Sequence, residues 1–385
     1  MKPTTYLSSL TSLRGIAALL VIFLHIDAIC FKLAPAGSHF FIRKGYLWVD
    51  FFFLLSGFIM VHVYGHSFSA NSNLHLFKRF MWARFARIYP LHLFSFLCML
   101  AFYFWYKASN TLTTFDHQLY NLNAIPTNLL LIHGLGVHPF LSWNAPSWSI
   151  STEWWMYVLF PLLLLLFQRT TPWKRWGILS FIMAGYLFIS YYLHPLSTVN
   201  SPYPDLTKVN SIDVTYDYGF IRCFFGFLFG MLIYDLYKIK WLFATLKSSL
   251  LWTGMVALVF ITLSINIPDT ITVLLFAAIV LMSAYNTGAA NAFLNLRPFL
   301  FLGDISYSLY LMHLPIMYFL LIYIKRFPSI TLNASMPVLW MYSFAYITIV
   351  LLISTLTYKL IELPMRNKLN QLTKKTKHSE KSLVS

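Results

Sequence analysis

Residues 11–26 read TSLRGIAALLVIFLHI, and with the next four residues they form an apolar run long enough to cross a bilayer. Arg14 and His25 lie inside this run, although charged and polar side chains are costly in lipid. A helix returns these side chains to within about 20° of each other and separates them by about 16 Å along its axis. One helix face would therefore carry a cation near one membrane surface and an imidazole toward the other. The alternative is an Arg that extends to the headgroups and a His that is hydrogen-bonded within a bundle.

The composition places the chain among membrane proteins. Hydrophobic residues make up 58% and charged residues 10%, whereas about 25% of residues are charged in soluble domains. This predicts an all-α, polytopic integral-membrane bundle, because helices satisfy their own backbone polar groups in lipid. The net charge of +16 indicates a basic surface that meets anionic lipid or an anionic ligand, with no soluble module to suggest nucleic-acid binding. The scattered cysteines indicate neither a disulfide framework nor a metal site.

Apolar windows of suitable length predict about ten transmembrane helices. They lie near 11–30, 46–64, 88–107, 149–167, 174–193, 218–237, 249–266, 270–288, 303–324 and 337–360. Lys and Arg concentrate in cytoplasmic connections, and their distribution favours a cytoplasmic N-terminus and, with ten spans, a cytoplasmic C-terminus.

The chain shows one predicted domain and a tail. Residues 1–366 form the transmembrane domain, and residues 367–385 form a short, basic cytoplasmic tail that we expect to be disordered and to touch lipid headgroups.

Three polar residues are predicted to lie at one depth, in the outer half of the membrane. They are His25, Asp50 and Glu153, each four or five residues from the outer end of its span. Two carboxylates and an imidazole in a low-dielectric bundle would shift one another's proton affinity, which suits general acid–base catalysis. A purely structural hydrogen-bond network is the alternative for each of them.

A basic motif is predicted at the inner surface. In RFMWARFARIYP, residues 79–90, Arg84 and Arg87 share a helix face, and forked guanidinium groups suit phosphates. Together with Arg14 they predict a phosphate site, the alternative being the ordinary positive belt of cytoplasmic loops.

Six motifs follow one another in the chain: LRGIAALLVIFLH from 13, VDFFFLLSGF from 49, RFARIYP from 84, WSISTEWW from 148, GDISYSLYLMH from 303 and IELPMR from 361. This series resembles the acyltransferase-3 family of integral-membrane O-acyltransferases, over about residues 7 to 366. The chain departs from it at Trp48, where the family commonly has Gly, and we expect no fused SGNH hydrolase-like domain.

The resemblance implies an O-acetyltransferase with ten helices in the bacterial inner membrane. It would move an acyl group, usually acetyl, from cytoplasmic acetyl-CoA to a hydroxyl of a carbohydrate handled at the outer face, such as lipopolysaccharide or exopolysaccharide. Acyl-CoA is then a co-substrate, no metal is needed, and a separate extracytoplasmic protein could complete the transfer. The Arg-x10-His and Arg-x-x-Arg motifs are implied to be functional.

The residues and the resemblance together suggest one mechanism. Arg84, Arg87 and Arg14 would hold coenzyme A phosphates, and His25 would act as general base or first accept the acyl group. Glu153 or Asp50 would orient or charge-balance the imidazole. Weaker candidates for substrate contacts are Ser149, Trp148, Tyr307 and His313.

Two other functions remain open from the sequence. One is an acyltransferase acting on a small hydrophobic molecule or a lipid. The other is a proton-coupled secondary transporter or flippase, in which Asp50, Glu153 and His25 would relay protons.

Overall fold

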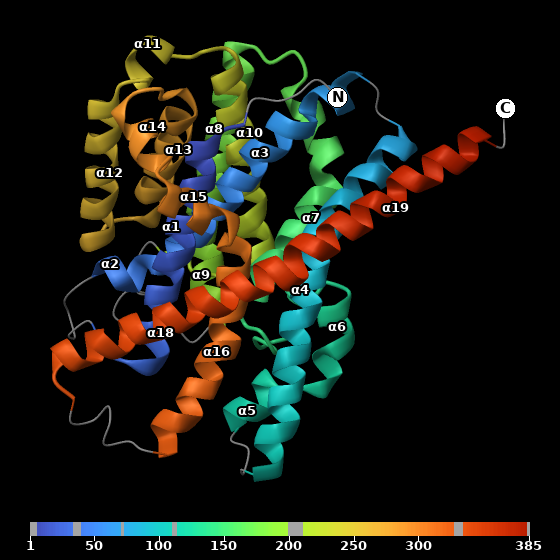
Figure 1. Cartoon of the computed structure of the whole chain (residues 1–385). Coiled ribbons are helices and arrows are strands. Elements are labelled where there is room, and N and C mark those ends of the chain that lie inside the picture. The colour runs from blue at the N-terminus through green and yellow to red at the C-terminus, as the bar shows by residue number, and fades with distance from the viewer. Residues whose placement is uncertain are drawn as a thin grey trace.

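The computed structural model describes residues 6–33, 40–70, 73–109, 114–198, 211–326 and 334–382, and this part of the chain contains helices and loops but no strand. Figure 1 shows a bundle in which the N-terminal helices pack among helices from the middle and the end of the chain. The all-helical prediction is confirmed for the described residues.

The long helices follow the predicted windows in order. They are α1 (Ser8–His25), α3 (Trp48–Ala70), α4 (Leu74–Ser109), α7 (Ser147–Leu164), α8 (Pro172–Phe188), α10 (Gly219–Lys238), α12 (Ser249–Ser264), α13 (Asp269–Tyr285), α16 (Ser306–Arg326) and α18 (Met336–Thr357). The helix α19 (Leu363–Ser382) lies beyond the last window. Short helices join them: α2 (Phe40–Arg43), α5 (Thr114–Leu119), α6 (Ile125–Leu129), α9 (His194–Leu196), α11 (Phe243–Leu246), α14 (Ala289–Leu294) and α15 (Arg297–Asp304).

Each of the ten predicted windows falls on a helix. In the described part of the chain, seven helical stretches are long and apolar enough to cross a membrane, and the pair α15 and α16, bent by 66°, would make an eighth. The helices α12 and α13 are apolar but shorter. An integral membrane protein is therefore supported, whereas ten spans and two cytoplasmic termini stay predictions.

The third helix differs from its predicted window. Its apolar window begins at residue 88, but α4 begins at Leu74 and continues through Pro90. Hydropathy detects only the apolar part of a helix, and a helix can tolerate a proline when neighbouring groups satisfy the freed carbonyl. Arg84 and Arg87 consequently lie within α4 and not in the connection before it.

The described backbone continues past the predicted domain boundary at residue 366. The helix α19 runs through Ser382, and it packs against α4, where the Trp82 indole N–H donates to the Leu369 carbonyl at 2.9 Å. In Figure 1 this helix crosses in front of α4. The division between a domain and a disordered tail stays a prediction.

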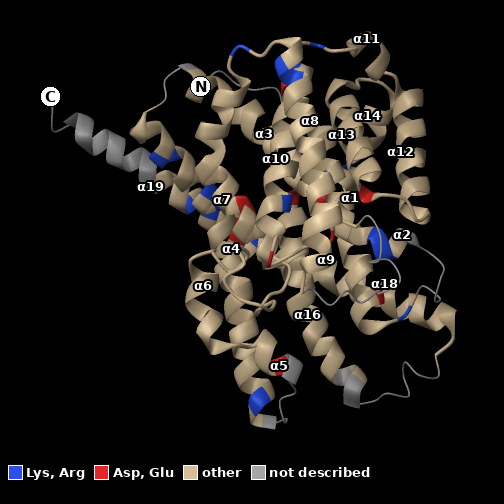
Figure 2. Ribbon diagram, turned by 180° about the vertical axis from the view of Figure 1, so that it is seen from behind, with Lys and Arg blue, Asp and Glu red and all other residues tan. Residues whose placement is uncertain are grey.

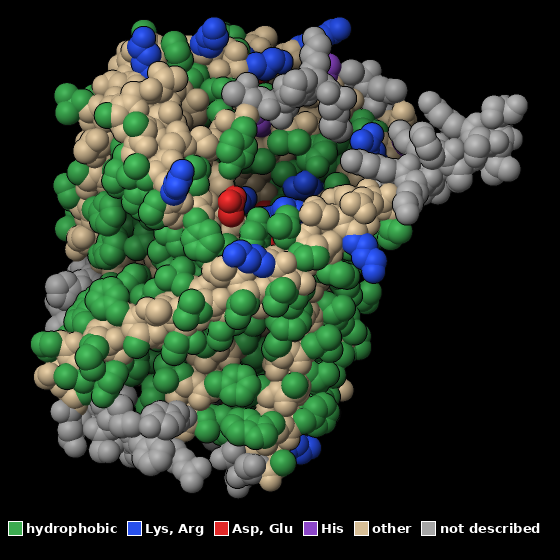
Figure 3. Space-filling view, in the orientation of Figure 1, with side chains coloured by type: hydrophobic (Ala, Val, Ile, Leu, Met, Phe, Trp, Pro, Cys, Tyr) green, Lys and Arg blue, Asp and Glu red, His purple; other side chains and the backbone are tan. Residues whose placement is uncertain are grey.

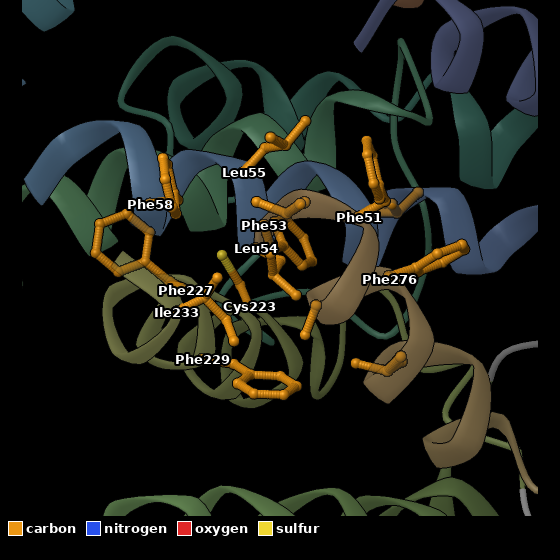
Figure 4. Close-up of a cluster of buried hydrophobic side chains, with 14 of the residues drawn as sticks. Phe51, Phe53, Leu54, Leu55, Phe58, Cys223, Phe227, Phe229, Ile233 and Phe276 are labelled. Atoms are coloured by element: carbon orange, nitrogen blue, oxygen red, sulfur yellow. The ribbon is translucent and has the colours of Figure 1, made fainter. Parts of the chain in front are cut away.

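The helices α3 and α10 form the centre of the core through close backbone contact. A Cβ atom added to Gly57 would lie 1.9 Å from the Phe227 carbonyl oxygen, and one added to Gly230 would lie 1.9 Å from that of Leu54. Large apolar side chains from both helices surround this contact, as Figure 4 shows. The glycines thus allow the two helices to touch, and this tight packing fixes the position of α3 in the bundle.

A second close contact joins α1 to α15. A Cβ atom on Gly15 would lie 2.5 Å from the Gly303 amide nitrogen, and one on Gly303 would lie 2.2 Å from the Thr11 carbonyl oxygen. The first and fifth sequence motifs therefore meet in space, and this contact brings Arg14 within reach of the turn that follows α15.

Candidate active site

A cavity of about 590 Å³ opens between α1, α3, α4, α7, α15, α16 and α19. Figure 3 shows a hollow on this face in which basic and acidic side chains gather, and Figure 2 shows charged residues close to α4, α7 and α19. The charged side chains of the lining are Arg14, Arg84, Arg87, Arg366, Glu153 and Asp304. Four cations and two carboxylates make the lining positive overall, which suits an anionic ligand.

Arg14 is held at the cavity by neutral groups. Its Nε donates to the Ser306 hydroxyl at 2.8 Å, and its Nη2 donates to the Gly303 carbonyl at 2.9 Å. Among the described residues it forms no ion pair with a carboxylate. These hydrogen bonds fix the orientation of the guanidinium group, but no carboxylate among the described residues neutralises its charge.

Arg84 is also held without a carboxylate partner among the residues described. Its Nη2 donates to the Tyr64 hydroxyl at 2.9 Å, and its guanidinium group lies over the rings of Tyr64 and Tyr157, at 5.2 and 5.9 Å from their centroids. Its buried Nε has no hydrogen-bond partner in the described part of the chain. An unpaired N–H donor and an uncompensated charge at a cavity are what a phosphate group would satisfy.

Arg87 differs from Arg84, although the two belong to one motif. It forms an ion pair with Glu362, which is 1% exposed, and its guanidinium group lies over the Tyr307 ring. The second carboxylate oxygen of Glu362 accepts from the Ser308 hydroxyl at 2.7 Å. Arg87 therefore joins α4 to the C-terminal segment. No role for Glu362 was predicted, although it stands in the last of the six motifs.

Glu153 lies in the arginine-lined cavity and not beside His25. It accepts a hydrogen bond of 2.5 Å from the Tyr157 hydroxyl, which also contacts Ser56 at 3.2 Å. No contact among the described residues joins Glu153 to His25 or Asp50, and their shared depth in the membrane stays a prediction. Counting residues from the end of a span gives a position along one helix, but not the direction in which its side chain points.

Asp50 forms a buried ion pair with Arg222. Two guanidinium nitrogens contact the carboxylate at 3.1 and 2.7 Å, and both side chains are fully buried. Arg222 also contacts Asp213 at 3.2 Å and the Val214 and Tyr46 carbonyls. The prediction that Asp50 orients His25 finds no contact to support it. A lone arginine inside a span was the signal for this pair, because it requires an acidic partner.

His25 contacts another imidazole. Its Nδ1 lies 2.9 Å from the Val21 carbonyl oxygen and 3.3 Å from Nε2 of His313, and the two ring centroids are 4.9 Å apart. Neither Asp50 nor Glu153 forms a hydrogen bond with it among the described residues. The partner His313 stands in the fifth motif and was predicted only as a weak substrate contact.

The remaining candidates divide between the cavity and its surroundings. Ser149, Tyr307 and Tyr310 line the cavity, and the Ser149 and Tyr310 hydroxyls are 2.8 Å apart. The Tyr310 ring also lies 6.0 Å from that of His313, so Tyr310 contacts both the cavity and one of the two imidazoles. Trp148 lies instead beside Arg222, with its ring 5.9 Å from the guanidinium carbon.

Comparison with known proteins agrees with these features. The family model described as "Acyltransferase domain" matches residues 7–359. "Protein 2 in picA locus" of Rhizobium radiobacter is 33% identical over 153 residues, which are 37% of this chain and 75% of that protein. "Acyltransferase MdmB" of Streptomyces mycarofaciens is 32% identical over 194 residues, 48% of this chain and 46% of that protein.

A third relative is aligned over more of the chain. "Putative acetyltransferase ORF330" of Acidianus two-tailed virus is 24% identical over 320 residues, 79% of this chain and 82% of that protein. No solved structure matches significantly. The family model covers most of the chain, and the chain therefore belongs to the acyltransferase-3 family of membrane-embedded acyltransferases.

Proposed function

We propose that this acyltransferase moves an acyl group, chiefly acetyl, from cytoplasmic acyl-CoA to a hydroxyl of a cell-surface or exported carbohydrate. The observation that carries the proposal is the cavity in which Arg14 and Arg84 are held without carboxylate partners among the described residues. Its volume of about 590 Å³ lies in the range of small-molecule sites, about 300–1,000 Å³.

The donor's phosphates would bind Arg84 and Arg14, which both line the cavity. Arg87 would contribute less, because Glu362 already compensates its charge. The thioester arm would extend past Ser149 and Tyr310 toward the two imidazoles, since the Tyr310 ring lies 6.0 Å from that of His313. This division places donor recognition in the cavity and the chemistry at His25.

The reaction at His25 would follow general-base catalysis. The imidazole takes the proton from the acceptor hydroxyl, whose oxygen forms a bond to the thioester carbonyl carbon while the C–S bond breaks. The leaving thiolate of coenzyme A then takes up a proton from the imidazolium. In the alternative that His25 first accepts the acyl group, the same imidazole acts as nucleophile.

The names of two relatives and the family resemblance support the group moved and the acceptor. MdmB is named an acyltransferase and ORF330 a putative acetyltransferase, which supports acyl transfer and favours acetyl as the group moved. A carbohydrate acceptor rests on the family resemblance. The outer surface of the cell is where such an acceptor would be modified, so an integral-membrane location at the bacterial inner membrane fits the proposal.

The test measures donor binding and transfer separately. Purified protein in nanodiscs should bind acetyl-CoA, seen as an increase in its thermal midpoint, and cells that express it should carry more O-acetyl groups on their envelope glycans by mass spectrometry. His25→Ala should abolish acetylation, a loss of about 10²–10⁴-fold, while donor binding remains. Absence of donor binding by folded wild-type protein would contradict the proposal.

A further inference from the structure

We infer that His313 is a positioning residue that holds His25 in one tautomer, so that Nε2 of His25 carries the free lone pair used in acyl transfer. The inference rests on the proposed function for its chemical meaning. The structural observation behind it is the contact of 3.3 Å between Nδ1 of His25 on α1 and Nε2 of His313 on α16.

Backbone carbonyls contribute the first acceptor for each ring and indicate which nitrogen carries the proton. Nδ1 of His25 lies 2.9 Å from the Val21 carbonyl oxygen, and Nδ1 of His313 lies 3.3 Å from that of Leu309. A carbonyl oxygen only accepts hydrogen bonds, so both Nδ1 atoms must donate. A neutral imidazole has a single N–H, and Nε2 of each ring is therefore unprotonated.

With these tautomers, the contact between the two rings pairs a donor on His25 with an acceptor on His313. The Nδ1–H of His25 is shared between the Val21 carbonyl and Nε2 of His313, which accepts. With the opposite tautomer of His25, the lone pair of Nδ1 would face the lone pairs of the carbonyl oxygen. Two acceptors thus hold one N–H in place, and Nε2 of His25 remains unprotonated and available.

His313 is itself firmly placed. Its side chain is 0% exposed, and its backbone carbonyl accepts a hydrogen bond of 2.6 Å from the Tyr346 hydroxyl on α18. His25 is only partly buried. A buried, anchored acceptor behind a partly exposed imidazole is the arrangement by which a third group orients a catalytic base.

In the reaction, Nε2 of His25 first takes up a proton and then gives it away. The acceptor hydroxyl gives its proton to Nε2 of His25 as its oxygen bonds to the thioester carbon and the C–S bond breaks. The imidazolium then has two N–H groups, and the Nδ1–H is stabilised by His313 and Val21. Transfer of the Nε2 proton to the departing thiolate restores the starting tautomer.

The first test is kinetic and uses His313→Ala and His313→Gln in nanodiscs. The alanine variant should lower kcat by at least about tenfold, but by less than His25→Ala, with the KM for acetyl-CoA unchanged. The Gln side chain can present an oxygen acceptor to the Nδ1–H and should recover much of the rate. His92→Gln is the matched control, because His92 is 1% exposed and bonds to the Asn128 carbonyl.

The second test reads the tautomer directly. Nitrogen-15 NMR of histidine-labelled wild-type protein should show a protonated Nδ1 and an unprotonated Nε2 for His25, assigned from the signals lost in His25→Ala. In His313→Ala only the Val21 carbonyl is left to accept the Nδ1–H, so part of the population should shift to the Nε2–H tautomer, whereas His313→Gln should keep the first one.

Opposite results would separate the two ideas. An Nε2–H tautomer in wild-type protein, or an undiminished kcat in folded His313→Ala, would overturn the positioning role while the proposed function stands. No transfer by wild-type protein, or full activity in His25→Ala, would overturn the proposed function, and the NMR measurement would still report on the pair.

Discussion

Two clusters of this molecule contain arginines beside aromatic rings, yet they differ in how their charge is balanced. Arg222 is 0% exposed and bonds to two carboxylates, Asp50 and Asp213. Arg14 and Arg84 line an open cavity and bond to hydroxyl and carbonyl groups. The residue type is the same in both clusters, and the partners decide whether an arginine stabilises the fold or can bind an anion.

The comparison has an energetic basis. A buried ion pair adds little net stability, but removing one partner leaves an uncompensated charge and is strongly destabilising. A cation that lacks an ionic partner at a cavity is instead available to a phosphate, with which it forms a charge-assisted hydrogen bond. Substitution of an arginine should therefore lower stability in the first cluster and ligand affinity in the second.

The largest effect is expected at Arg222. Arg222→Met should lower the free energy of unfolding by about 3–5 kcal/mol, because it leaves the Asp50 carboxylate buried without its cation. Thermal unfolding in detergent, followed by the loss of the monodisperse peak in size-exclusion chromatography, would measure this. Adding Asp50→Leu should recover part of the loss. Wild-type stability of the single variant would mean that the cluster does not hold the bundle together.

Arg84 should affect ligand binding with little change in stability. Arg84→Gln removes one charge-assisted phosphate contact, and acetyl-CoA affinity should fall by about 1.5–3 kcal/mol, more than tenfold. Arg84→Lys should recover only part of this, since an ammonium group lacks the planar fork. Isothermal titration in nanodiscs gives the Kd, and unchanged affinity at a normal thermal midpoint would place the donor elsewhere.

Arg87 should behave more like Arg222 than like its neighbour in the motif. Arg87→Gln leaves the buried Glu362 carboxylate without its ionic partner, and the free energy of unfolding should fall by about 1–3 kcal/mol. Donor affinity, measured on the fraction that remains folded, should change less than in Arg84→Gln. Equal losses of affinity in the two variants would show that both arginines hold phosphates.

The smallest effect is expected at Glu153. Because it lines the same cavity as the arginines, Glu153→Gln should raise acetyl-CoA affinity by no more than about 1 kcal/mol, roughly fivefold. The Gln side-chain oxygen can still accept a hydrogen bond from the Tyr157 hydroxyl, so the local structure is kept. The gain should shrink as salt is added. A salt-independent, unchanged Kd would indicate that the donor's charge lies far from Glu153.

The helices could be predicted from the sequence because lipid and protein interiors both require long apolar segments. All ten windows fall on helices, and the motifs that carry Arg14, Arg84, Ser149 and Tyr307 all contribute to the cavity. Window edges were less accurate: α4 begins 14 positions before its window, because polar residues in its first turns hide the helix from a hydropathy average.

The sequence by itself determined the class of protein, the approximate helices and three of the four arginines that line the cavity, because these depend on composition and local spacing. Only the tertiary structure decided the partners. Asp50 meets Arg222 across 172 positions, Arg87 meets Glu362 across 275, and His25 meets His313 across 288. Such pairs depend on how helices rotate and tilt against one another, and a position along one helix carries no information about that rotation.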